Sequence, residues 1–271
     1  MAPDSFRWRS LVVFYALAFV LSWLGWLPQA LHSRGLFPFD HPLLALLGGV
    51  GPTLAAVITV WALEGKDGPR ALFAPLFRWR VPWLWYAVVL LSWSVIALVA
   101  LGVGTLGGHP FPPLGRVPWG ALPSIFVAMV LSNVWEEVGW RGFALPRFQE
   151  RLSDLATALL MGVLWLLWHV PLLLNPASPM SGLPWYADLL FSLALSVIYI
   201  WLYNHTRRSL LLVTLFHAMS NTVAWALMEL GVYTSSYPFV VGVTAAWAAA
   251  IVLRYGAGRF ASPASAETRA G

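Results

Sequence analysis

The chain contains eight stretches that are each long and apolar enough to cross a lipid bilayer as a helix. A helix rises 1.5 Å per residue, so about 20 apolar residues span the hydrocarbon core of a bilayer. Backbone polar groups inside that core must pair within the chain, which favours helices. The spans are expected near residues 10–30, 43–63, 81–104, 119–141, 155–174, 185–204, 209–230 and 236–257.

The composition agrees with this fold class and excludes a soluble globular protein. Hydrophobic residues make up 59% of the 271 residues and charged residues only 10%, against about 25% charged in an average soluble domain. We therefore predict an all-α polytopic membrane protein with about eight transmembrane helices around a polar cavity. Residues 1–260 would form a single transmembrane domain and residues 261–271 a disordered cytoplasmic tail.

The distribution of basic residues predicts the orientation. When the connections are assigned to alternate sides of the membrane, 14 of the 16 Lys and Arg residues fall on one side. Only Arg34 and Arg116 fall on the other side. By the positive-inside rule, this predicts a multi-pass protein of the cell membrane with both termini cytoplasmic. The net charge of +5 thus follows from orientation. No connection combines a basic run with aromatic residues, so no nucleic-acid partner is expected.

Ionisable residues are rare within the spans, and each is a candidate for function because its burial in a bilayer is costly. The chain has no cysteine, which excludes thiol chemistry. In the fourth span, Glu137 and Arg141 are spaced to form an ion pair on one helix face. Glu136, rotated by about 100° around the helix, is left free for another task. The alternative is that both glutamates lie solvated at the cytoplasmic interface.

Three further polar residues lie in the fifth and seventh spans. His217 and Asn221 share a helix face, and their N–H groups suit an oxyanion; hydrogen bonding between helices is the alternative. His169 is a lone histidine, of the kind that more often serves packing. On straight helices it lies about 20 Å deep, against about 12 Å for His217. The two meet Glu136 only if the fifth helix is tilted, starts later or bends at Pro171.

Together these residues form three motifs in a fixed order on successive spans, within residues 132–221. The arrangement resembles the CPBP family, which comprises the type II CAAX prenyl proteases and the bacteriocin-processing and abortive-infection (ABI) proteins. The second motif usually opens with Phe in that family, where this chain has Trp165. The motifs are Glu136-Glu137-x-x-x-Arg141, Trp165-x-x-x-His169 and His217-x-x-x-Asn221.

The resemblance implies an intramembrane endopeptidase. In the family, the residues matching Glu136 and His169 activate a water molecule for attack on the scissile carbonyl. Those matching His217 and Asn221 stabilise the tetrahedral oxyanion. The expected partners are therefore the lipid bilayer and a membrane-associated or lipid-anchored peptide or protein substrate.

The resemblance also assigns a supporting role to Glu137 and Arg141, which would hold the architecture of the site. The preferred interpretation needs no cofactor. Alternatively, Glu136, His169 and His217 could supply three ligands of an open zinc site.

Two other classes of function remain open from the sequence. A non-catalytic membrane scaffold or immunity protein could keep the polar cluster for helix packing alone. A proton-coupled transporter could use the cluster as a proton relay, although paired broken helices in inverted repeats, often found in transporters, are not evident.

Overall fold

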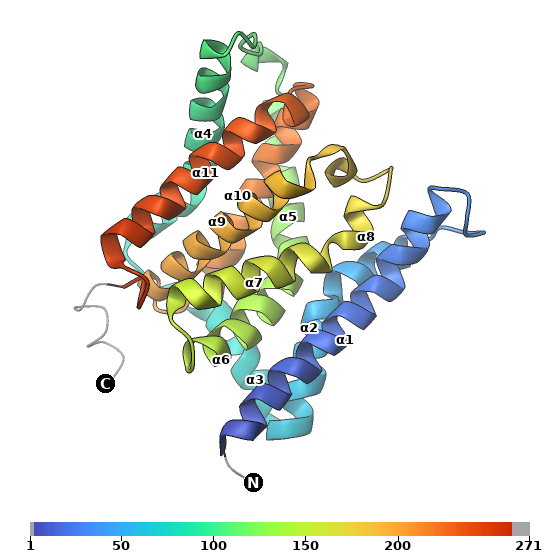
Figure 1. The fold of residues 1–271 in the computed structure, drawn as a ribbon, viewed down its shortest axis with the longest axis vertical. Coiled ribbons are helices and arrows are strands. Elements are labelled where there is room, and N and C mark those ends of the chain that lie inside the picture. The colour runs from blue at the N-terminus through green and yellow to red at the C-terminus, as the bar shows by residue number, and fades with distance from the viewer. Residues whose placement is uncertain (1–2, 262–271) are drawn as a thin grey trace.

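A computed structural model describes residues 3–261, which form a bundle of helices without a β-strand in that range. Within it, seven segments are long and apolar enough to cross a bilayer, which confirms the predicted all-α polytopic fold (Figure 1). Six of them are single helices: α1 (Pro3–His32), α2 (Pro42–Glu64), α4 (Trp83–Leu106), α9 (Trp185–His205), α10 (Leu210–Glu229) and α11 (Tyr233–Tyr255).

The remaining long segment carries the two adjacent glutamates and is built from consecutive helical pieces of different types. It comprises α5 (Leu122–Glu137), a π-helix (Val138–Ala144) and α6 (Leu145–Gln149). The segment therefore extends beyond the predicted boundary at residue 141. Short π-helical segments are rare and frequently occur at functional sites.

The predicted span over residues 155–174 is wrong in its extent. Helix α7 (Asp154–Trp168) has 15 residues, too few to cross a bilayer, and α8 (Val170–Leu173) follows after a break at His169. Pro171 lies in the first turn of α8, where its missing N–H costs no helical hydrogen bond. The described residues thus contain seven segments long enough to span a bilayer and the shorter apolar helix α7, where the sequence predicted eight full spans.

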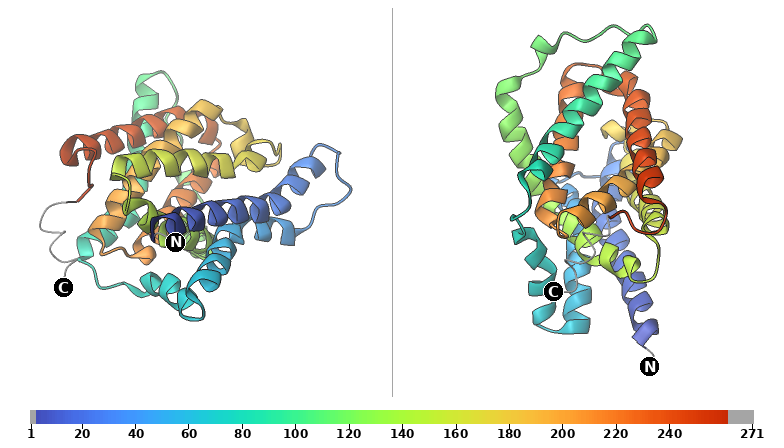
Figure 2. Two further views of the ribbon diagram at one scale, coloured as in Figure 1. Left: turned by 60° about the horizontal axis from the view of Figure 1, so that its bottom comes forward. Right: turned by 90° about the vertical axis from the view of Figure 1, so that its left-hand side faces the viewer.

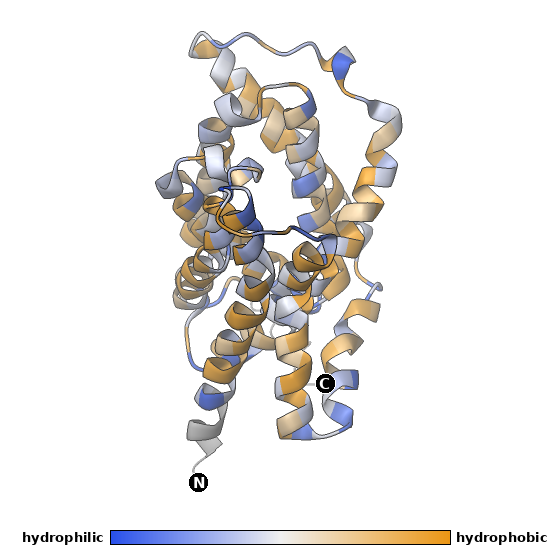
Figure 3. Ribbon diagram, turned by 90° about the vertical axis from the view of Figure 1, so that its right-hand side faces the viewer, coloured by the Kyte–Doolittle hydropathy of each residue, from blue (hydrophilic) through white to orange (hydrophobic). Residues whose placement is uncertain are grey.

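The basic and the less charged connections lie at opposite ends of the bundle. The N-terminus, α3 (Asp67–Phe73) and α6 lie toward one end, and the connections from α4 to α5 and from α10 to α11 toward the other (Figures 1 and 2). Figure 3 shows mainly apolar residues along the helices, with polar residues at the α2–α3 turn and in other connections. The described residues also include four short 3-10 helices: Ala74–Phe77, Leu114–Arg116, Trp119–Ala121 and Pro179–Gly182.

Glycines bring helices into backbone contact around the site. A Cβ atom on Gly162 of α7 would lie 2.9 Å from both the Cα of Leu193 and the carbonyl oxygen of Ser192 in α9. A Cβ on Gly139 would lie 2.6 Å from the Cβ of Pro52 in α2. Since real side chains do not approach so closely, α7 and the π-helix can pack at these positions only because they carry glycine.

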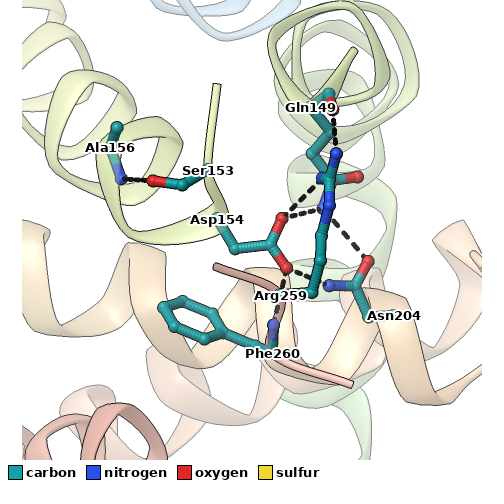
Figure 4. A network of polar contacts seen from close by, with 7 residues as sticks. All are labelled: Gln149, Ser153, Asp154, Ala156, Asn204, Arg259 and Phe260. Carbon is teal, nitrogen blue, oxygen red and sulfur yellow. Dashed lines mark hydrogen bonds and ion pairs between the residues drawn. The ribbon is translucent and has the colours of Figure 1, made fainter. Parts of the chain in front are cut away.

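A buried carboxylate fixes the N-terminal end of α7. Asp154 is fully buried and accepts hydrogen bonds from the side chains of Gln149, Asn204 and Arg259 and from the backbone N–H of Phe260 (Figure 4). This network ties the segment after α11 to the start of α7. The tail predicted for 261–271 lies outside the described residues except for its first residue.

Candidate active site

Glu137 lies at the centre of a buried polar cluster formed by the π-helix segment and α10. Its Oε1 atom accepts hydrogen bonds from Nη1 of Arg141 at 3.0 Å and from Nδ1 of His217 at 2.8 Å. All three side chains are buried. The predicted ion pair is present, and Glu137 makes an additional contact with α10 that the spacing within one helix could not indicate.

Arg141 is enclosed by aromatic rings. Its guanidinium carbon lies 3.8 Å from the ring centre of Tyr199 and 5.4 Å from that of Trp165. A guanidinium over an aromatic face is stabilised by the ring quadrupole. Arg141 therefore belongs to the protein interior and does not contribute to the basic connections with which the sequence analysis counted it. Tyr199 was missed because it is an ordinary aromatic residue in the sequence of α9.

His169 lies close to the cluster although a straight helix would place it too deep. The ring of Trp165 lies 4.9 Å from that of His169 and 5.9 Å from that of His217, centre to centre. Helix α7 is strongly inclined to the long axis of the molecule (Figures 1 and 2) and ends at Trp168. Tilt and an early helix end thus bring the second and third motifs together.

Both histidines hold one ring nitrogen in a hydrogen bond and leave the other available. Nδ1 of His169 lies 2.8 Å from the carbonyl oxygen of Trp165, and Nδ1 of His217 lies 2.8 Å from the Glu137 carboxylate. Carbonyl and carboxylate oxygens only accept, so Nδ1 is the protonated nitrogen in each ring. Nε2 of each ring is therefore left for a contact with water or substrate, as an acceptor when the ring is neutral and as a donor when it is protonated.

Glu136 interacts electrostatically with His217, Glu137 and Arg141 and lies beside Trp165. The indole N–H of Trp165 is directed at the carboxyl group of Glu136, and neither Trp165 Nε1 nor Glu136 Oε2 has another hydrogen-bond partner among the described side chains. Three further atoms of the cluster are buried without a hydrogen-bond partner among these side chains: Asn133 Nδ2, Glu137 Oε2 and the hydroxyl oxygen of Tyr199.

Asn221 extends the site along α10. Its Nδ2 atom donates to Oδ1 of Asn133 at 3.2 Å, which uses one of the two amide N–H groups and leaves the second. Asn133 is buried one helical turn before Glu137. It belongs to the polar residues of the fourth predicted span but has no role in the three motifs, although its position on the same helix face as Glu137 indicates one.

Two cavities adjoin this part of α10. A cavity of about 90 Å³ is lined by Ser220 and Asn221 and by aromatic residues that include Trp93, Phe191 and Tyr237. A second, largely apolar cavity of about 480 Å³ lies between α4, α5 and α10. Asn221 therefore borders open space inside the bundle, as a residue that contacts substrate must.

The structure shows how the three residues of the zinc alternative lie. Among residues 3–261, no group of three or more His, Asp and Glu residues lies close enough to hold a metal ion. Glu136, His169 and His217 do not form such a group. We therefore derive no chemical step through a metal.

Comparison with known proteins shows which family these motifs resemble. Residues 118–223 match the model of the family described as "Type II CAAX prenyl endopeptidase Rce1-like". The chain is also 26% identical over 225 residues to "CAAX prenyl protease 2" of Methanococcus maripaludis, covering 77% of this chain and 82% of the relative. Both matches confirm the resemblance predicted from the motifs: the chain is similar to the type II CAAX prenyl endopeptidases, and this similarity supports the predicted class of a CAAX-type intramembrane endopeptidase.

Proposed function

We propose that this protein hydrolyses a peptide bond of a membrane-associated peptide with a water molecule activated by Glu136 and His169. The observation that carries the proposal is the paired orientation of the two imidazoles. His169 and His217 each give Nδ1–H to a fixed oxygen at 2.8 Å and keep Nε2 available, and both rings pack against Trp165. Helix packing alone requires no such arrangement.

In the proposed first step, the carboxylate of Glu136 takes a proton from water while Nε2 of His169 orients the same molecule. The water oxygen bonds to the scissile carbonyl carbon, and the carbonyl electron pair moves onto oxygen. The oxyanion electron pair then re-forms the carbonyl as the C–N bond breaks, and the proton passes from Glu136 to the departing amide nitrogen. A carboxylic acid and an amine result, which ionise to a carboxylate and an ammonium group. General acid–base catalysis of this kind contributes roughly 10²–10⁴-fold to the rate.

The oxyanion of the intermediate would be stabilised from α10. A proton on Nε2 of His217 is balanced by the carboxylate of Glu137, so the imidazolium can donate to the oxyanion without an uncompensated charge. The second amide N–H of Asn221 provides the other donor. Asn133 holds the Asn221 amide and thereby fixes the direction of that N–H.

Glu137 and Arg141 act as positioning residues in this proposal. The Glu137 oxygen that contacts Nδ1 of His217 also contacts Arg141, whose guanidinium is held between Tyr199 and Trp165. A buried carboxylate requires such a cationic partner. The ion pair therefore fixes both the tautomer and the position of His217.

We infer that the substrate reaches the site from the lipid bilayer and carries an apolar anchor or segment. The name of the M. maripaludis relative suggests a prenylated peptide as the first candidate. Following the distribution of basic residues, we place the protein in the cell membrane with both termini in the cytoplasm. Because the chain has no cysteine, single cysteines at Ser33 and at Lys66 can test this orientation: only the former should react with an impermeant thiol reagent outside intact cells.

The function is tested by incubating the purified protein with membrane-anchored peptides in vesicles and identifying the products by mass spectrometry. A peptide ending in a CAAX sequence is used with and without a prenyl group. We expect cleavage by the wild type and none by Glu136→Ala, His169→Ala or His217→Ala. Cleavage by Glu136→Ala at the wild-type rate would contradict the proposed water activation. A folded protein that cleaves none of the peptides would favour a scaffold or a transporter, and proton flux into vesicles would identify the latter.

A further inference from the structure

Four arginines lie together at the end of the bundle where α4 and α10 begin. Arg78 and Arg80 precede α4, and Arg207 and Arg208 form the turn between α9 and α10. Arg78 Nη1 donates to the Arg207 carbonyl at 3.2 Å, Arg207 Nη1 to the Arg80 carbonyl at 3.4 Å, and Ser209 Oγ to the Arg78 carbonyl at 2.6 Å. Figure 2 shows the two connections side by side. We call these four residues the arginine cluster.

The cluster carries positive charge without an anionic partner among the described side chains. Other arginines near this end are paired: Arg147 contacts Glu64 at 2.9 Å, and Arg259 contacts Asp154 at 3.0 Å. The Nε atom of Arg208 is moreover buried and has no hydrogen-bond partner. The charge of the cluster is therefore not compensated by an acidic side chain among the described residues and can attract an external anion.

The turn that presents two of these arginines is strained. Arg207 and Arg208 have φ angles of 54° and 58°, in the left-handed region that residues other than Gly and Asn seldom adopt. Two consecutive arginines in this conformation cost stability that glycines would not cost. Strain of this kind collects at ligand-binding sites.

The helix ends and the surrounding surface also favour the binding of an anion at the membrane surface. The N-terminal ends of α4 (24 residues) and α10 (20 residues) point their backbone N–H groups and partial positive charge toward this region, and α4 has no capping side chain. Phe77, Trp79 and Trp83 beside the cluster are 78%, 58% and 77% exposed. Tryptophans exposed at the end of a transmembrane helix contact the interfacial region of the bilayer.

We propose that the arginine cluster binds the phosphate of an anionic phospholipid, with the acyl chains against Phe77, Trp79 and Trp83. The exposed aromatic residues favour a lipid over free phosphate, because they offer no contact to an inorganic ion. The guanidinium groups provide planar pairs of donors suited to phosphate oxygens. This site is distinct from the cluster around Glu137, and the proposal does not depend on the hydrolytic activity.

The test is binding of phosphatidylglycerol to the full chain in neutral detergent, followed by native mass spectrometry, with phosphatidylcholine of equal chain length for comparison. The double variant Arg207→Asn/Arg208→Asn removes two charges, while Asn adopts the left-handed conformation more readily than Arg. The control Lys66→Asn/Arg70→Asn removes the same charge from the α2–α3 region. We expect binding of phosphatidylglycerol to weaken about tenfold or more in the first variant and to change less than about threefold in the control.

Equal weakening in both double variants would show diffuse attraction and overturn the proposal, as would wild-type binding by Arg207→Asn/Arg208→Asn. Inorganic phosphate is titrated in a separate arm, and competition at concentrations equal to those of the lipid would assign the cluster to free phosphate instead. Thermal unfolding checks that each variant is folded. If the turn variant unfolds, Arg78→Asn/Arg80→Asn, which lies outside the strained turn, provides the same comparison.

Discussion

Nδ1 of His217 lies 2.8 Å from Oε1 of Glu137, across 80 residues of sequence. The same carboxylate oxygen contacts Arg141 at 3.0 Å. One buried carboxylate thus connects an ion pair within a single helical segment to an imidazole on another helix. This connection distinguishes the residues that hold the site together from the residues that are free to react.

Glu137→Gln should reduce both stability and activity. The substitution leaves the buried guanidinium of Arg141 without its anionic partner, which costs about 3–5 kcal/mol, and it removes the charge that balances a protonated His217. Thermal unfolding in detergent and peptide cleavage are measured in parallel. The double variant Glu137→Gln/Arg141→Gln should recover part of the stability, because no unpaired charge remains, but not the activity. A double variant as active as the wild type would contradict the positioning role.

Glu136→Gln should abolish cleavage while the fold is kept. The amide has the shape of the carboxylate but cannot take a proton from water, so the rate should fall roughly 10²–10⁴-fold. The unfolding temperature should change little, since the amide oxygen of Gln can still accept a hydrogen bond from the Trp165 indole. Glu229→Gln, an exposed glutamate at the end of α10, is the control and should leave the rate unchanged. An active Glu136→Gln enzyme would require another base.

Asn221→Ala should lower kcat more than it raises KM. An oxyanion donor acts mainly in the transition state, and loss of one such donor costs about 10²–10³-fold in kcat. Steady-state kinetics with a fluorogenic membrane peptide separates the two constants. Asn175→Ala, in the connection after α8, should match the wild type. If Asn221→Ala raised KM alone, the residue would bind the ground state of the substrate instead.

Gly162→Ala should destabilise the protein and impair catalysis. The new Cβ would meet the backbone of Leu193 and Ser192 at 2.9 Å, which forces α7 away from α9 at a cost of about 1–3 kcal/mol. The displacement would move Trp165 and His169 on the same helix. Gly102→Ala in α4 meets no atom within 4 Å and should stabilise its helix by up to about 1 kcal/mol. Opposite shifts of the unfolding temperature in the two variants are therefore expected.

Treatment with a strong chelator should leave cleavage unchanged. Glu136, His169 and His217 do not form a three-residue metal group, and the proposed steps use only their proton chemistry. Activity is measured after dialysis against chelator and again after addition of Zn²⁺. Loss of activity that Zn²⁺ restores would support the zinc site that the sequence left open.

The sequence predicted the fold class and indicated which residues form the candidate site, because both depend on local composition and spacing. Long apolar runs can only fold as helices in a bilayer, and polar residues within them are few enough to be examined one at a time. The spacing of Glu137 and Arg141 predicted their ion pair correctly. The span over residues 155–174 was wrong because hydropathy does not register where a helix ends, and α7 stops at Trp168.

The sequence by itself determined that the chain spans a membrane and that its scarce polar residues fall into three motifs on different helices. Only the tertiary structure decided how the motifs meet. The tilt of α7, its backbone contact with α9 at Gly162 and the anchoring of Asp154 by the segment after α11 place His169 near His217. These contacts join residues far apart in the chain, and no local periodicity encodes them. For the same reason Tyr199 became visible as part of the site only in the folded protein, where its neighbours are known.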